Sequence, residues 1–150
     1  MPERKTIERA QKAKRQGKAP STQAGEFVRE EFEHIREGKH GARSTKQAIA
    51  IGLSKARRAG VKLPPPEKGT TSERTRKSAA SAYRAGQGGR RRKPSTRRSR
   101  ATTRALKREP RKAASPAAIS RQARTARKRT RSTARKRTAS SSRRGRTSAA

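Results

Sequence analysis

The distribution of the large apolar side chains limits where this chain can build a core. Apart from Leu106 and Ile119, every Met, Ile, Leu, Val and Phe lies before residue 64, and Tyr83 is the only aromatic residue after it. We therefore expect any core to lie within the first 63 residues. A folded unit of roughly 40 residues is at the lower limit of independent stability without a disulfide, a metal or a partner.

The rest of the chain is strongly cationic. Residues 64–150 contain 29 Lys and Arg against three Glu, which is +26 of the total formal charge of +35. Self-repulsion and low apolar content oppose collapse of such a segment, so we expect a disordered Arg-rich tail. A polycation releases the counterions that are condensed on a polyphosphate, and this release dominates non-specific affinity for nucleic acids. The composition therefore predicts a nucleic-acid-binding protein.

Apolar periodicity in the first part of the chain predicts a mostly α fold. Residues 22–37 suit an amphipathic helix, with Ser21 or Thr22 as its cap and Gly38 directly after its end. The apolar stripe of this helix consists of Ala24, Phe27, Val28, Phe32 and Ile35.

A second helix is expected over residues 45–59. Ser44 and Gln47 have the spacing of a capping box, Gly60 suits the end of the helix, and the prolines at 64–66 stop it. Small residues along its apolar stripe, such as Gly52 and Ala56, favour a close approach to the Phe-containing face of the preceding helix. Two such helices joined by a short turn predict an antiparallel helical hairpin.

Weaker patterns indicate extra helices at 3–16 and 72–85. The domain organisation predicted on this basis is a basic arm (1–20), the hairpin domain (21–63), a Pro/Gly-bounded linker with a helix (64–89) and the disordered tail (90–150). Within the tail, TARKRTRS at 125–132 recurs as TARKRTAS at 133–140, which indicates tandem charge units rather than a packed solenoid. Ser115 and Pro116 suit the start of a helix over 116–138, formed once phosphates neutralise its Arg side chains.

The stretch GKHGARSTKQAIAIGLSKARRAGVKLPPP (38–66) resembles a family of small basic bacterial proteins of unknown function. Its members have a GKxG-type turn before a KQAIAI(A/G)LSxAR(K/R)AG helix and are often labelled DNA-binding. The resemblance covers about residues 20–66 and implies an ordered core, a bacterial source and DNA binding. Residues 68–150 resemble the tails of linker-histone-like bacterial proteins, but they are Arg-rich and lack regular Lys-Pro-Lys repeats.

Basic and amide side chains around the helix at 45–59 are the candidate nucleic-acid contacts of the helical unit. An ordinary solvated face, contact with phosphates alone and reading of base edges are the three alternatives. These candidates are Lys39, Arg43, Lys46, Gln47, Lys55, Arg57 and Arg58. In the tail, the candidates are Arg90, Arg91, Arg92, Lys93, Arg97, Arg98, Arg127, Lys128, Arg129, Arg135, Lys136, Arg137, Arg143, Arg144 and Arg146.

Four glutamates, at positions 26, 30, 33 and 37, share one side of the helix at 22–37. A solvated face is one interpretation, and a docking strip for the protein's own Arg tail is another. The spacing of Glu30, His34 and Glu37 permits a metal site, but the sequence indicates no further ligands, so we expect no metal and no cofactor.

The composition argues against catalysis and membrane insertion. The chain has no Asp and no Cys and only two His, which excludes a Ser-His-Asp triad and a Cys-His pair, so we expect no enzyme and no small-molecule substrate. No apolar run of membrane-spanning or signal-peptide length occurs. We expect a cytoplasmic, nucleoid-associated, histone-like protein that prefers DNA, with RNA or ribosome association as the alternative. Ile51 lies among outward residues, and an ordinary exposed Ile, a homodimer contact and cover by segment 72–85 are the three interpretations.

Overall fold

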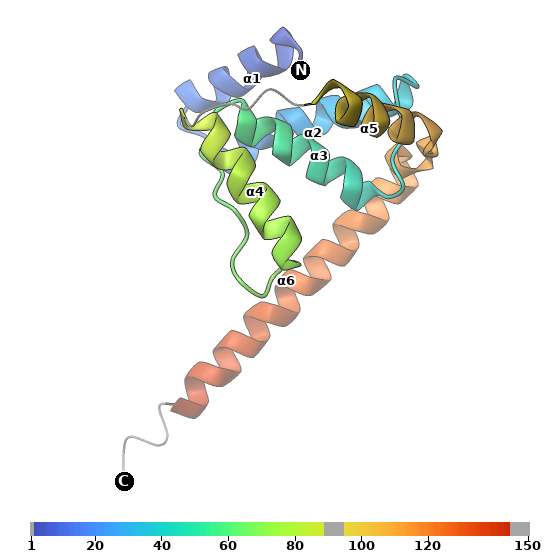
Figure 1. Ribbon diagram of the computed structural model, residues 1–150. Coiled ribbons are helices and arrows are strands. Elements are labelled where there is room, and N and C mark those ends of the chain that lie inside the picture. The colour runs from blue at the N-terminus through green and yellow to red at the C-terminus, as the bar shows by residue number, and fades with distance from the viewer. Residues whose placement is uncertain (1, 89–94, 145–150) are drawn as a thin grey trace. The chain divides into compact units, whose positions relative to one another are not determined.

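The computed structural model describes residues 2–88 and 95–144, without the side chains of 133–144 (Figure 1). Its regular structure is helical, with six α-helices, one 3₁₀ helix and no strand among the described residues. The mostly α fold class is therefore confirmed. The chain forms two compact units, one ending at Ser115 and the other beginning at Pro116.

The centre of the first unit is the expected hairpin, made by α2 (Pro20–Arg36) and α3 (Thr45–Arg58). The Ser44 hydroxyl accepts a hydrogen bond from the Gln47 backbone N–H at 3.2 Å, as the capping motif predicts. Gly38 and Gly60 follow the two helices with φ of 79° and 94°, the left-handed conformation that glycine favours.

The two hairpin helices approach closely at Gly52. A Cβ at this position would lie 2.7 Å from Val28 Cα and 3.0 Å from the Phe27 carbonyl oxygen. Phe27 and Ala56 are fully or almost fully buried beside this crossing. The small residues of α3 therefore allow its backbone to pack closely against that of α2, as the sequence predicts.

Helix α1 (Arg4–Arg15) packs against α2. It buries Thr6, Ala10 and Ala13, and Ala10 joins a core cluster that includes Phe27 and Val61. The segment is thus a packed helix rather than a loose basic arm. Two alanines and a threonine are enough to hold α1 in place, because they pack on an apolar surface formed by α2 and the segment after α3.

Helix α4 (Glu73–Gly86) packs against α3, and the Ser72 hydroxyl caps it by accepting a hydrogen bond from Thr75 N–H at 3.3 Å. The expected helix at 72–85 is therefore confirmed. Its buried residues are Ala79 and Ala82, while Tyr83 is only half-buried. Ile51 on α3 is also half-buried.

The expectation that the core ends at residue 63 is wrong, because two distant alanines complete it. Helix α5 (Thr96–Arg108) leads to a 3₁₀ helix, η1 (Arg111–Ala114), which packs against α2 and α3. Ala113 and Ala114 are buried in a second core cluster with Ile35 and Ala48. Thr45 Oγ1 donates to the Ala113 carbonyl at 2.8 Å, and Arg36 Nε donates to the Ala114 carbonyl at 3.0 Å.

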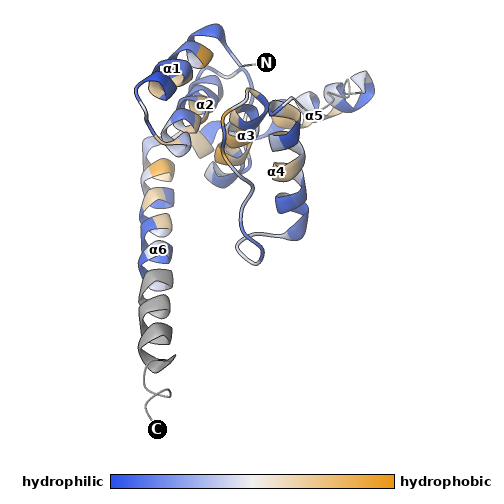
Figure 2. Cartoon of the chain, turned by 90° about the vertical axis from the view of Figure 1, so that its left-hand side faces the viewer, coloured by the Kyte–Doolittle hydropathy of each residue, from blue (hydrophilic) through white to orange (hydrophobic). Residues whose placement is uncertain are grey.

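The expectation of a disordered tail from residue 90 also differs from the structure. Residues 96–108 are helical, and the second unit is the helix α6 (Pro116–Arg144), which begins at the expected Pro116. Ala and Arg have high helix propensity, so local preference opposes the charge repulsion. In Figure 2 the polar colours extend along α5, which buries no residue. Within the described residues, no helix is apolar over a length that would cross a membrane.

Candidate nucleic-acid interface

The N-terminal end of α3 presents two of the predicted cationic contacts. Arg43 is 81% exposed, with Nε 3.6 Å from Glu109 Oε1, and Lys46 is exposed. Gln47 is half-buried, and its Oε1 accepts a hydrogen bond from the Arg43 backbone N–H at 2.8 Å. Because that amide oxygen caps the helix, Gln47 is poorly placed to read a base edge.

Lys39 lies on the turn after α2 and takes part in two ion pairs. Its Nζ is 2.9 Å from Glu37 Oε2 and 3.1 Å from Glu3 Oε1. The hydrogen bonds to Glu37 and then to Glu3 raise the pKa of Lys39. This side chain is half-exposed, but two carboxylates already neutralise it.

Two of the predicted contacts on α3 do not lie on an outward surface. Arg57 is only 7% exposed, and its guanidinium donates to the carbonyls of Leu63 and Pro64 at 3.1 and 3.3 Å. Burial lowers the pKa of Arg57. Lys55 Nζ lies 2.7 Å from Oε2 of the fully buried Glu31. The expectation that these two cations face outward is therefore wrong, because Lys55 joins α3 to α2 and Arg57 holds the segment that follows α3. Arg58 beside them is exposed.

The described candidates of the tail are exposed, but they lie on helices rather than in a disordered tail. Arg97 and Arg98 are exposed on α5, and Arg127, Lys128 and Arg129 are exposed on α6. Arg135, Lys136, Arg137, Arg143 and Arg144 belong to the part of α6 whose side chains are not described. Arg90, Arg91, Arg92, Lys93 and Arg146 lie outside the described residues.

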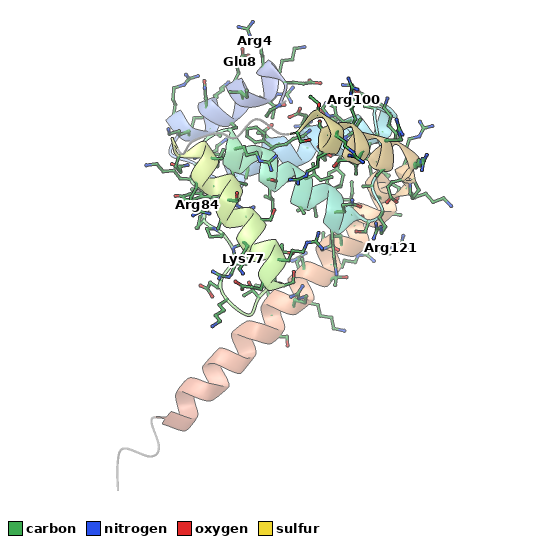
Figure 3. The ribbon with its side chains drawn as sticks, in the orientation of Figure 1. Arg4, Glu8, Lys77, Arg84, Arg100 and Arg121 are labelled. Atoms are coloured by element: carbon green, nitrogen blue, oxygen red, sulfur yellow. The ribbon has the colours of Figure 1, made fainter. Side chains whose placement is uncertain are left out.

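Cations dominate the exposed surface well beyond the predicted set. Between residues 95 and 132 there are fourteen Lys and Arg, all exposed, and a single acid, Glu109. Figure 3 shows the labelled Lys77 and Arg84 on α4, Arg100 on α5 and Arg121 on α6 projecting away from their helices. Such side chains keep their charges hydrated and available to a polyanion.

The four-glutamate line of α2 is not a uniform solvated face. Glu33 pairs with Arg29 at 3.2 Å and Glu37 with Lys39, but Glu30 is only 2% exposed. Glu30 is buried because the N-terminal segment covers it, and the Glu3 backbone N–H donates to Glu30 Oε1 at 3.1 Å. This burial removes one carboxylate from any docking strip for the tail.

Beside Glu30 lies an ionic cluster that the sequence analysis missed. His34 Nε2 is 2.9 Å from Glu3 Oε1 and 3.7 Å from Glu30 Oε1, and His40 Nε2 is 3.2 Å from Glu31 Oε1. Hydrogen bonds from His34 and then Lys39 lower the pKa of Glu3 to about 2.

Only part of this cluster has a signal in the sequence. His34 lies three and four residues after Glu31 and Glu30, so helical spacing places the three together. Glu3 and His40 come from other segments, and only the packing of α1 and the turn after α2 brings them there.

Comparison with known families finds a match over the first part of the chain. Residues 3–68 match the model of a family of unknown function (DUF6496). The match spans α1, the hairpin and the segment that receives the Arg57 guanidinium, so it reaches further toward the N-terminus than the resemblance at 20–66. Neither curated proteins nor solved structures gave a significant match.

Proposed function

We propose that this protein binds nucleic acid, and duplex DNA in particular, with little sequence preference, as a histone-like protein of the bacterial nucleoid. The helical unit orients the chain, and the cationic segment after residue 90 neutralises phosphates. This is a binding role in the cytoplasm, and it requires neither catalysis nor a cofactor.

One observation carries the proposal: fourteen exposed Lys and Arg between residues 95 and 132 accompany a single carboxylate. The ordinary partners of surface cations are therefore missing from that stretch of sequence, and an external polyanion is the partner that its charge favours. Arg outnumbers Lys twofold in the chain, 30 to 15, which favours bidentate contacts with phosphate.

The burial of side chains on α3 also supports contact with the phosphate backbone of DNA rather than with base edges. In α3, the amide of Gln47 caps the helix, Lys55 pairs with Glu31 of α2, and Arg57 donates to a carbonyl of the segment after α3. The exposed candidates that remain on α3 and just before it, Arg43, Lys46 and Arg58, suit phosphates, and phosphate contacts position a protein without reading sequence.

The experiment neutralises part of α6 in the full-length protein. Changing Arg121, Arg124, Arg127 and Lys128 to Gln should weaken binding to unrelated duplexes to a similar extent. Changing the three arginines to Lys is the matched control, because it keeps the charge and should retain most of the affinity. Unchanged affinity of the Gln variant at low salt would refute a role for this segment.

RNA or ribosome association is the second candidate, because Arg-rich segments also fold onto structured RNA. Competition between duplex DNA and structured RNA at equal phosphate concentration separates the two. If the RNA displaces most of the protein from the DNA under these conditions, RNA is the preferred ligand and the proposal changes accordingly. A membrane surface is a poorer match, since α5 lacks the apolar face of an interfacial helix.

A further inference from the structure

Both histidines of the chain meet at one place. The sequence contains only His34 and His40, and their ring centroids are 6.1 Å apart in an edge-to-face arrangement. His34 comes from the last turns of α2, and His40 from the turn that follows it. Glu31, one turn before His34, completes a group whose ligand atoms all lie within 4.8 Å of one another.

Glu30 and Glu31 are the buried carboxylates of this cluster, and three of their four oxygens have no well-aligned donor among the described residues. Glu31 is fully buried, and neither of its oxygens accepts a well-aligned hydrogen bond from the described residues; the same holds for Glu30 Oε2. Lys55 Nζ compensates part of the charge at Glu31 Oε2, 2.7 Å away. His40 Nε2 lies 3.2 Å from Oε1 but outside hydrogen-bond alignment. Buried carboxylate oxygens without aligned donors are costly, so the position beside Glu31 Oε1 favours a cation in addition to Lys55.

Two imidazoles and one carboxylate are a donor set that suits zinc. Zinc binds His nitrogen and Glu oxygen at about 2.0–2.2 Å, so in a tetrahedral site the ligand atoms are roughly 3–3.6 Å apart. The distance from Glu31 Oε1 to His40 Nε2 already lies in this range. Small rotations of side chains would bring the third ligand atom to the same separation, because it starts within 4.8 Å.

The surroundings supply the outer partners that metal ligands need. Lys55 holds Oε2 of Glu31, which leaves Oε1 directed to the cluster, and Glu3 and Glu30 flank Nε2 of His34. His40 Nδ1 lies 3.1 Å from the Gly41 carbonyl oxygen, a contact that orients its ring. Such outer hydrogen bonds fix the orientation of ligating side chains.

We propose that Glu31, His34 and His40 bind one zinc ion, or a divalent transition metal with the same preference for imidazole and carboxylate. The ion joins α2 to the turn at 38–43. It acts as a cross-link, a role that a disulfide often has in small domains and that this chain without cysteine cannot fill in that way. The proposal does not depend on nucleic-acid binding. It reverses the expectation from sequence, which considered Glu37 as a ligand, whereas Glu37 pairs with Lys39.

The first test uses the full-length wild-type protein, freed of nucleic acid at high salt. Zinc chloride is titrated while the imidazole nitrogens are followed by NMR, where two histidines give two assignable sets of signals. One equivalent of zinc should shift both sets, and Co²⁺ should give the visible absorption of a tetrahedral nitrogen/oxygen site. Imidazole signals that do not move at excess zinc would overturn the proposal, and no variant is needed for this result.

The second test measures zinc affinity by competition with a chromophoric chelator. His34→Asn, His40→Asn and Glu31→Gln should each weaken binding by more than about 100-fold, and Glu3→Gln by about 10- to 100-fold as an outer partner. Glu33→Gln, on the same helix but paired with Arg29 at the surface, is the matched control and should change affinity by less than about twofold. Circular dichroism identifies any variant that has unfolded. Folded His variants that bind zinc as tightly as the control would show that the cluster is an ion-pair network only.

Discussion

At the residue scale, the structure depends on positions where a hydrogen atom is the only side chain that fits. Gly52 is one such position, and the sequence indicated it correctly, because a small-residue stripe facing two phenylalanines is a recognisable pattern. Gly41 is another, since a Cβ there would overlap the Glu109 carbonyl oxygen. Nothing in the sequence around Gly41 signals this contact, because its partner is 68 residues away along the chain.

Gly52→Ala should destabilise the protein by up to about 2 kcal/mol. The new Cβ meets backbone atoms of Val28 and Phe27, which cannot rotate away, and overpacking of this kind costs about 1–3 kcal/mol against a gain of about 1 kcal/mol in helix propensity. Gly25→Ala on α2 is the matched control; apart from the local backbone of its own helix, no atom lies within 4 Å of its Cβ, so it should stabilise by about 0.5–1 kcal/mol. Urea denaturation measures both, and equal stability of the two variants would disprove the close approach.

The ion pair at the start of α4 gives a pH-dependent signal. Hydrogen bonds from Arg76 at 2.7 and 2.9 Å lower the pKa of Glu73 below its ordinary value of 4.5. Because the folded-state pKa is depressed, the stabilisation is complete above pH 4.5 and is lost as the pH falls through the lower folded-state value. An NMR titration of the Glu73 carboxyl carbon should therefore have its midpoint below 4.5. Arg76→Gln should return the midpoint toward 4.5. A midpoint that does not change on this substitution would contradict the ion pair between Glu73 and Arg76.

At the element scale, the sequence predicts helices better than it predicts which of them pack. The hairpin and α4 were expected because periodicity and Ser caps are local signals. The docking of η1 was not, since a segment with two alanines among cations has no local pattern that distinguishes it from a solvated tail. Ala113 and Ala114 fit only because Ile35, Ala42 and Ala48 leave a space of alanine size. Likewise, the sequence around Arg57 is typical of a surface cation, and only the structure shows that its guanidinium donates to the Leu63 and Pro64 carbonyls.

Ala114→Arg should release the segment 106–115 from the hairpin. Ala114 is 1% exposed, so a guanidinium cannot be accommodated there without displacing η1. The backbone N–H groups of Gly41 and Ala42, which donate to the carbonyls of Leu106 and Pro110 at 2.8 and 3.1 Å, should then exchange with deuterium much faster. Ala105→Arg, at an exposed position of α5, is the control. Protection of these two amides that is the same in both variants would refute the docking.

At the scale of the whole molecule, charge decides the function that we propose. Ten acids cannot neutralise 45 Lys and Arg, and several of those acids are committed to ion pairs within the first unit. The sequence alone is sufficient for this conclusion, because net charge does not depend on the fold. What the sequence could not indicate is which cations are structural, and the structure assigns Lys55 and Arg57 to that group.

The salt dependence of binding tests this account most directly. If the full-length protein contacts about ten phosphates of duplex DNA, the logarithm of its association constant should fall with the logarithm of salt concentration at a slope near −9, by the rule of about −0.9 per phosphate. Fluorescence anisotropy with two unrelated duplexes measures the slope, which should be the same for both. A slope shallower than about −3 would contradict a mechanism in which the cationic segment is the binding element.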